Sequence, residues 1–217
     1  LHRQGTEAVA HHQLPGGGVA HRERLGQRSP RLDLDIDADQ VAARARFNST
    51  LAGLRNSVAG GFDFSRWERE VAGTYGSSAR QRNNAVYLKD DLTLTGGTRL
   101  SAGMRHEALH KTHSAVAQAM DDTMHAWELG VVQPLSQQWQ VYGRLGRSFR
   151  LANADEFSYT SGTPLRPQTS RDLEVGARWK NRHDHADLRL YRSSLHDEIG
   201  FDTGANGGWG ANVNFEP

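Results

Sequence analysis

The strongest constraint on the fold is a repeated two-residue alternation of apolar and polar side chains. Residues 32–37 read Leu-Asp-Leu-Asp-Ile-Asp, and residues 172–179 alternate in the same way. Successive side chains of a β-strand point to opposite faces, so this pattern predicts strands with one apolar and one polar face. The 217-residue chain is 36% hydrophobic, and no stretch approaches the roughly 20 consecutive apolar residues of a membrane helix. The pattern indicates an all-β fold.

The connections between the predicted strands alternate in length. Gly96-Gly97 is typical of a two-residue hairpin, and short turns are also predicted at 133–138 and 180–185. The remaining strands are separated by long polar segments, namely 65–83, 108–124, 148–169 and 202–211. Outer-membrane barrels combine short turns at one end, long loops at the other and strands of low average hydropathy. The sequence therefore predicts an antiparallel up-and-down transmembrane β-barrel.

Aromatic residues lie near the ends of the predicted strands. They are Trp67, Trp127, Trp139, Tyr142, Trp179 and Tyr191. Trp and Tyr gather at both membrane–water interfaces of a barrel, and this distribution is consistent with such a girdle. Aromatic residues also favour strands in general, so this feature alone fits a soluble sheet equally well.

Three segments carry a family resemblance. Residues 140–157 read QVYGRLGRSFRLANADEF, residues 165–176 read LRPQTSRDLEVG, and residues 85–107 contain AVYLKDDL followed by LSAGMRHE. In this order and spacing they resemble strand and hairpin motifs in the barrel of TonB-dependent outer-membrane receptors. The resemblance covers about residues 30–217.

The resemblance implies a location in the bacterial outer membrane and the active uptake of a scarce chelate, such as a ferric siderophore, haem or cobalamin. It implies no enzymatic activity and no cofactor. The implied partners are outer-membrane lipid, the chelate itself, and the TonB complex, which is reached through a plug domain.

Family barrels have about twenty-two strands, whereas eight or nine are predicted in this chain, and nothing in it resembles the plug. We therefore expect residues 1–217 to form part of such a barrel, with residues 1–29 as a loop. A chain that begins without Met and ends within an alternating segment is expected to be a fragment.

The 148–169 loop is the predicted ligand-contact segment. It combines charged, amide and aromatic groups, and a few such groups usually orient a ligand in its site. The candidates are Arg150, Asn153, Asp155, Phe157 and Tyr159. The alternative is that Arg150 pairs with Glu156 and stabilises the loop.

His106-Glu107-Ala108-Leu109-His110 matches the H-E-x-x-H signature of zinc peptidases. On a helix from Met104 to Met120 the two histidines would share one face, and Glu128 or His113 would supply a third ligand. The alternation of Leu100–Arg105 favours a strand instead, in which residues four apart lie about 13 Å apart. A zinc metallopeptidase and a passive porin-type barrel remain the alternative functions.

His110 and His113 are also weak candidates for binding a metal chelate or haem, since neutral imidazole ligates iron readily. With His125, Asp121 and Asp122 they are expected around one external loop; solvated loop residues are the alternative.

Composition excludes other classes of protein. The formal net charge is +1 and no block of Lys or Arg occurs, which argues against a nucleic-acid partner. The chain has no Cys, which excludes a disulfide scaffold and a cysteine-ligated zinc site.

Overall fold

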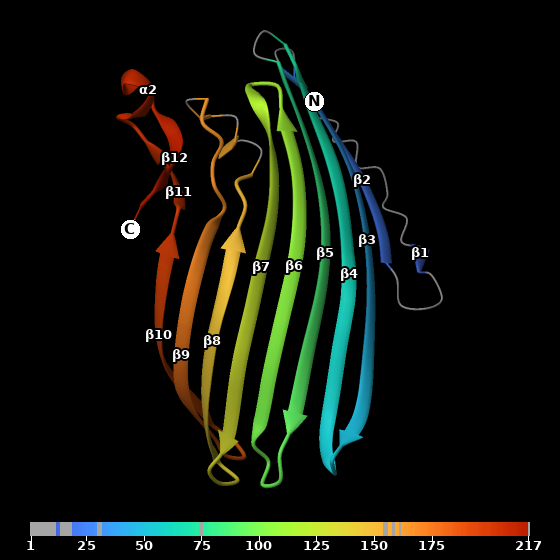
Figure 1. Ribbon diagram of the computed structural model, residues 1–217, viewed down its shortest axis with the longest axis vertical. Coiled ribbons are helices and arrows are strands. Elements are labelled where there is room, and N and C mark those ends of the chain that lie inside the picture. Colours follow the sequence, from blue (N-terminus) through green and yellow to red (C-terminus); the bar gives the residue numbers. More distant parts are fainter. Residues whose placement is uncertain are drawn as a thin grey trace.

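The protein is a strongly curved antiparallel sheet with a small second sheet at one end (Figure 1). The computed structural model describes residues 12–13, 19–29, 32–73, 76–153, 156–157, 159–160 and 162–216. The main sheet consists of β1 (His12–Gln13), β2 (Val19–Ser29), β3 (Leu32–Leu51), β4 (Leu54–Ala72), β5 (Ser77–Thr93), β6 (Arg99–His113), β7 (Val116–Pro134), β8 (Trp139–Arg150), β9 (Gln168–Lys180) and β10 (His185–His196). The second sheet pairs β11 (Glu198–Asp202) with β12 (Ala211–Phe215), joined through the helical turn α2 (Ala205–Gly208).

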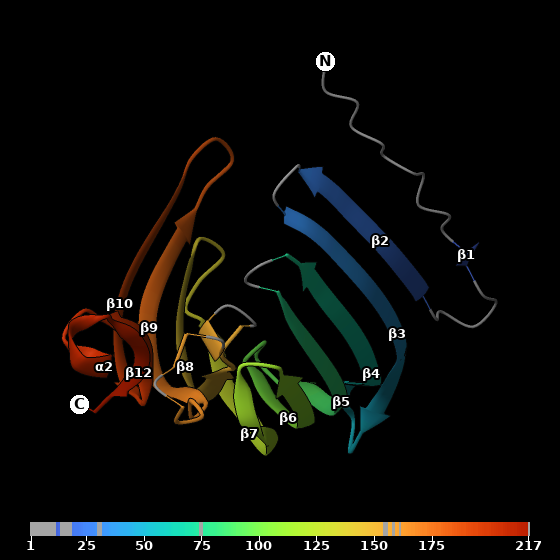
Figure 2. The ribbon, with the colours of Figure 1, turned by 90° about the horizontal axis from the view of Figure 1, so that it is seen from above.

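Every strand of the main sheet pairs with its neighbours in the sequence, in the order β1 to β10. This is the predicted all-β, antiparallel up-and-down topology, and it is confirmed. Seen from above, the sheet forms an open arc rather than a closed ring, with β2 and β10 toward its two ends (Figure 2). The sheet is therefore part of a barrel wall.

The structure differs from the strand prediction in two details. Residues 19–29, predicted as loop, form β2 and pair with β3, and the main sheet has ten strands rather than eight or nine in total. The additional strands are β1 and β2, which precede the strand predicted at 32–37. A turn at Ala52-Gly53 joins β3 to β4. Both residues have positive φ, 50° and 81°, as the type I′ turn of a two-residue hairpin requires.

Two of the predicted long loops are largely strand. β4 and β5 run through most of 65–83, and β6 and β7 run through most of 108–124, where only Ser114 and Ala115 lie between the strands. The ladder pairs Ala79 with His113 and Leu109 with Asp122 in this region. The predicted loops at 148–169 and 202–211 are confirmed, since β8 ends at Arg150 and β11 at Asp202.

The two ends of the sheet differ. At the end called here the turn end, short connections at 52–53, 94–98, 135–138 and 181–184 join the strands. At the loop end, at the top of Figure 1, lie the 151–167 loop and the β11–β12 sheet. Strands β3, β4 and β7 have 20, 19 and 19 residues, whereas about 9–11 tilted residues cross a bilayer. These strands therefore continue well beyond one membrane thickness.

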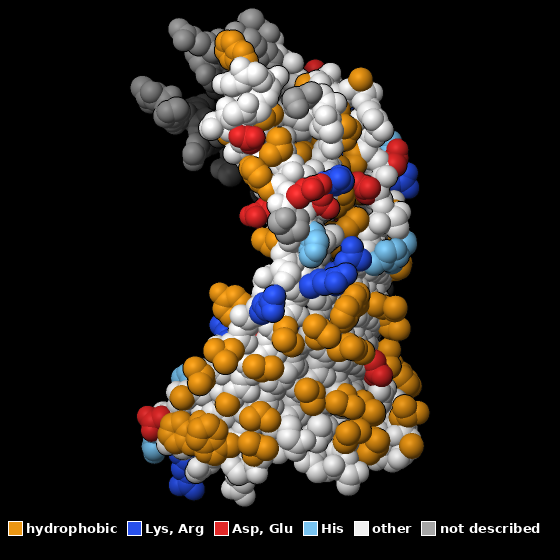
Figure 3. All heavy atoms as spheres, turned by 60° about the vertical axis from the view of Figure 1, so that its left-hand side comes forward, with side chains coloured by type: hydrophobic (Ala, Val, Ile, Leu, Met, Phe, Trp, Pro, Cys, Tyr) orange, Lys and Arg blue, Asp and Glu red, His pale blue; other side chains and the backbone are white. Residues whose placement is uncertain are grey.

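The polar rows of side chains lie on the inside of the arc. Asp172, Glu174 and Gly176 are partly buried, whereas Leu173 and Val175 between them are about half exposed. Side chains crowd together on the concave face of a curved sheet and spread apart on the convex face, so the less exposed polar row is the concave one. In Figure 3 hydrophobic side chains form a band over the lower part of the molecule. The convex face thus carries an apolar band of the kind that contacts lipid.

No helix in the described part of the chain is long and apolar enough to span a membrane.

Candidate functional site

The concave face carries a network of charged side chains across neighbouring strands. Arg105 of β6 bonds to Asp63 of β4 at 2.7 Å and to Glu107 at 2.8 Å. Asn83 donates to Glu107 at 2.9 Å, so the nearly buried Glu107 carboxylate has two partners. Charged groups are costly to bury unless they are paired and hydrogen-bonded. This pairing explains how an inward row can remain polar in a chain without a large core.

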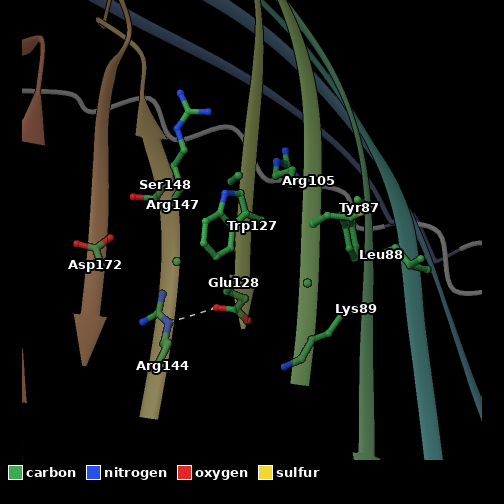
Figure 4. A pocket seen from close by; sticks show the side chains of 14 residues that line it. Tyr87, Leu88, Lys89, Arg105, Trp127, Glu128, Arg144, Arg147, Ser148 and Asp172 are labelled. Carbon is green, nitrogen blue, oxygen red and sulfur yellow. Dashed lines mark ion pairs between the residues drawn. The ribbon is translucent and has the colours of Figure 1, made fainter. Parts of the chain in front are cut away.

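A shallow hollow of about 280 Å³ lies on the concave face where Gly103 and Gly146 provide no side chain. Figure 4 shows Glu128 of β7 and Arg144 of β8 pointing toward one another at its edge; their Oε2–Nε distance is 3.4 Å. Lys89 and Asp172 also line it. The hollow therefore offers both signs of charge to a polar occupant.

Tyrosine and glycine interlock between strands on the same face. A Cβ placed on Gly176 would lie 2.3 Å from the Tyr142 ring, and one on Gly61 would lie 2.4 Å from the Tyr87 hydroxyl. Each glycine thus leaves room for an aromatic ring from the neighbouring strand, a device that fixes strand register. The Tyr142 hydroxyl also donates to Asp187 at 2.9 Å, and Asp187 accepts from Arg178 at 2.7 Å. The alternation pattern alone did not reveal these contacts.

At the loop end, the 151–167 loop packs on the sheet through a small apolar core. Phe157 is 0% exposed, and the cluster around it includes residues of β6, β7, the loop and β11. Its members are Leu109, Val116, Met120, Ala152, Phe157, Leu165 and Ile199, with Leu151 packed against them. This is the hydrophobic core cluster among the described residues, and it holds the loop over the concave face.

A buried lysine lies beside this cluster. Lys111 of β6 is 1% exposed; its Nζ donates to the backbone carbonyl of Ala152 and lies 5.5 Å from the centre of the Phe157 ring. It lies seven positions along β6 from Met104, where the outward apolar band gives way to His106, so it lies beyond the membrane-spanning part. Burial lowers the pKa of Lys111 from its ordinary value of 10.5 to about 8, against the opposing effect of the Glu156 carboxylate.

The predicted ligand-contact residues lie in this loop, and several of them hold it together. Arg150 forms a double hydrogen bond with Glu156, both at 2.9 Å, as the stability alternative predicted. The Asn153 side chain accepts from the Glu156 N–H at 2.8 Å, and the Glu156 carboxylate accepts from the Asn153 N–H at 2.9 Å, the reciprocal pattern of a capping box. Tyr159 is 66% exposed, whereas Phe157 is fully buried.

Asp155 lies outside the described residues. A role of this loop in ligand binding stays a prediction.

The zinc-peptidase alternative required a helix, and this requirement is not met. His106 to His110 lie within β6, so the two histidines are separated along an extended strand, and Glu107 points to the opposite face. His106 instead faces His125 of β7, with 3.3 Å between their Nδ1 atoms, and His110 bonds to Asp121 at 2.6 Å.

The weak metal candidates are not brought together either. His113 is buried on the concave side, where its ring packs edge-on against Phe157 and its Nδ1 accepts from the N–H of Ala115. The side chains of His110 and His125 point to the convex face. In the ranges that the structure describes, no three His, Asp or Glu side chains are grouped to hold a metal ion.

Comparison with known proteins identifies the family. Residues 6–214 match the family model described as TonB dependent receptor-like, beta-barrel. No curated protein sequence matches the chain.

Solved structures share the fold at low sequence identity. The alcaligin outer-membrane receptor FauA of Bordetella pertussis is 14% identical with a TM-score of 0.66, and the match covers 91% of this chain and 37% of FauA. Pseudomonas aeruginosa FpvA, solved with heterologous pyoverdines, is 13% identical with a TM-score of 0.68, covering 93% of this chain and 35% of FpvA. The copper transporter OprC is 13% identical with a TM-score of 0.67, covering 91% and 37%.

The chain thus spans little more than a third of the length of these receptors. Its match to the family model extends over nearly all of its length, and its open sheet has the topology that the barrel motifs predicted. The chain belongs to the TonB-dependent receptor family.

Proposed function

We propose that this chain is part of the barrel wall of an outer-membrane receptor that captures a scarce metal chelate and imports it actively. The remaining wall and a plug domain that contacts the TonB complex would belong to the same receptor. A ferric siderophore is the first substrate class to test, because FauA is a receptor for alcaligin and BauA of Acinetobacter baumannii is a receptor for ferric preacinetobactin. Haem, cobalamin and, by similarity to OprC, copper are the further candidates.

The observation that carries this proposal is the polar concave face together with the loop fixed above its open end. A wall that keeps Arg105, Glu107, Glu128 and Arg144 on its inner side suits a water-filled passage or a polar plug. The 151–167 loop, which is held by Phe157 and Lys111, would form one side of the mouth.

Within this loop we propose that Tyr159 contacts the ligand, because its ring is exposed while its neighbours are anchored. Arg150, Asn153 and Glu156 would hold the loop in position. Asp155 stays a candidate ligand contact.

The test is uptake by cells that depend on the complete receptor containing this chain. We expect the parent strain to take up at least one ferric chelate under iron limitation, and to lose that uptake on deletion of the gene or when the proton-motive force is dissipated. Uptake that persists without the proton-motive force would indicate a passive porin. Replacement of Tyr159 by Ala should weaken binding of the chelate, whereas Ser136→Ala at the turn end should leave it unchanged.

A further inference from the structure

On the convex face, the outward side chains change from apolar to basic at the edge of the apolar band nearest the loop end. On β8, β9 and β10 the apolar band ends at Leu145, Leu173 and Leu190, and the next outward residues toward the loop end are Arg147, Arg171 and Arg192. These three arginines are here called the outward arginine cluster. Figure 3 shows Lys, Arg and His side chains directly above the hydrophobic band.

The edge of the band at the turn end has a different composition. There Trp139 of β8 and Trp179 of β9 face outward as a cross-strand pair, with 6.4 Å between ring centres. Tryptophan suits a membrane interface without requiring a charged headgroup. The asymmetry indicates that the loop end meets a more anionic layer than the turn end.

The cluster is arranged as a site for an anion. Arg147 and Arg171 are direct partners in the β8–β9 register, which places their Cβ atoms about 5 Å apart. Arg192 is paired with Leu173 and is therefore a diagonal neighbour of Arg171. Like charges directly opposite each other destabilise a sheet, and in the described part of the chain none of the three arginines has a carboxylate partner. An anion bound between them would remove the repulsion.

The surrounding outward positions reinforce the positive charge. Beyond the band, the described outward residues of β8, β9 and β10 are the three arginines, Phe149, Thr169, Ser194 and His196, none of them acidic. On the adjoining strands β6 and β7 the first outward positions beyond the band are the paired His106 and His125. The carboxylates of Asp172 and Glu174 point to the other face of the sheet.

We propose that the outward arginine cluster binds the phosphate groups of an anionic lipid in the outer leaflet of the membrane. This inference rests on the proposed placement of the receptor in the outer membrane. Guanidinium groups recognise phosphate through paired hydrogen bonds. The apolar band directly below the cluster would hold the acyl chains of the same molecule, which a free phosphate ion could not use. Among such lipids a diphosphorylated glycolipid of the lipid A type fits best, because its two phosphates suit a cluster of more than one guanidinium group.

The test compares lipid binding by variants of the complete receptor. The receptor is purified in a non-ionic detergent, diphosphoryl lipid A is titrated in, and retained lipid is counted by native mass spectrometry. The test variant combines Arg147→Gln with Arg171→Gln. The control combines Arg44→Gln with Arg189→Gln, which removes the same charge from exposed positions on the concave face. Heat-modifiable migration in electrophoresis confirms that each barrel is folded.

We expect the wild type and the control to retain diphosphoryl lipid A with equal affinity, and the test variant to lose roughly thirtyfold, as expected for two arginines beside an anionic headgroup. Dephosphorylated lipid A should bind equally weakly to all three proteins. Equal losses in test variant and control, no preference for the phosphorylated lipid, or self-association through the cluster would each overturn the proposal. A receptor that does not form a heat-modifiable barrel at all would instead refute its placement in the outer membrane.

Discussion

Replacing Val175 by arginine tests which face of the sheet contacts lipid. Val175 is 49% exposed on the convex face, between Leu173 and Ala177 on its own strand. It lies four residues from Trp179 at one edge of the apolar band and four from Arg171 at the other, so it occupies the middle of the band. An arginine at the bilayer midplane of a barrel costs about 2–4 kcal/mol, and we expect Val175→Arg to lower the free energy of unfolding by that amount.

The matched control is Tyr191→Arg. Tyr191 lies on β10 at the same height, is 78% exposed and points to the concave side, where it is the register partner of Glu174. An arginine there gains an opposite charge across the strands, a pair worth less than about 1 kcal/mol, and stays out of lipid. Gly176 is unsuitable as a control, because a side chain there would collide with the Tyr142 ring.

The measurement is equilibrium unfolding in urea of the complete receptor, folded into phospholipid vesicles and followed by tryptophan fluorescence. Val175→Arg should lower the midpoint clearly, and Tyr191→Arg should leave it nearly unchanged. If Tyr191→Arg destabilised the receptor as much as Val175→Arg, or if Val175→Arg had no effect, the assignment of the two faces would be wrong.

Four further predictions follow from the same structure. With the loop end outside the cell, a cysteine at Ser114 should react with an impermeant reagent on whole cells and one at Ser136 should not; labelling at Ser136 alone would reverse the orientation. Phe157→Ala should cost about 3–5 kcal/mol of local packing and open the 151–167 loop to protease, whereas Tyr159→Ala, at an exposed position, should not; equal cleavage of both variants would contradict the anchoring role. Because folding lowers the pKa of Lys111 to about 8, the unfolded chain binds more protons between about pH 8 and 10.5, so the folded state should gain stability as pH rises through that window; Lys111→Met should remove this gain, and an unchanged pH profile would refute the burial argument. Expressed alone, the chain should form inclusion bodies and no heat-modifiable barrel, since the sheet of the described residues is an open arc and lipid does not tolerate the edges of an open sheet; a soluble, cooperatively melting monomer would contradict this.

The sequence predicted the fold class, because alternation is strong wherever one face meets lipid. In β9, Leu173, Val175 and Ala177 alternate with Asp172, Glu174 and Gly176, and the structure places the two sets on opposite faces. The apolar face leaves a clear signal with a period of two. The aromatic girdle was predicted less well: Trp139, Trp179 and Trp127 face outward, but Tyr142 and Tyr191 face inward. Tyr191 also lies near the middle of β10 rather than at a strand end.

The strands were not predicted from the sequence where they extend beyond the membrane. Around Arg82 and His110 both faces of the ladder meet water or polar groups, so the alternation disappears while the backbone hydrogen bonds continue. Polar strands of this kind look like loops in a sequence. The turn at Ala52-Gly53 was missed because the common Asn-Gly and Asp-Gly signals are absent.

The candidate site was predicted in place but not in detail. The 148–169 segment is the long loop at the mouth, yet no sequence pattern indicated that Phe157 would be buried or that Lys111, about forty residues earlier, would hold its backbone. These contacts depend on how the loop folds back across β6 and β7. Long-range packing of this kind leaves no local periodicity.

The unequal strand lengths have a consequence for how such a receptor can change during evolution. Strands β3 to β7 continue past the membrane as a paired ladder, and inserting one residue there would turn every following side chain to the opposite face. The 151–167 loop can change length without disturbing any register. Lineages that acquire new ligands should therefore add and lose residues on the β8–β9 side of the mouth, and vary the β4–β7 side by substitution alone.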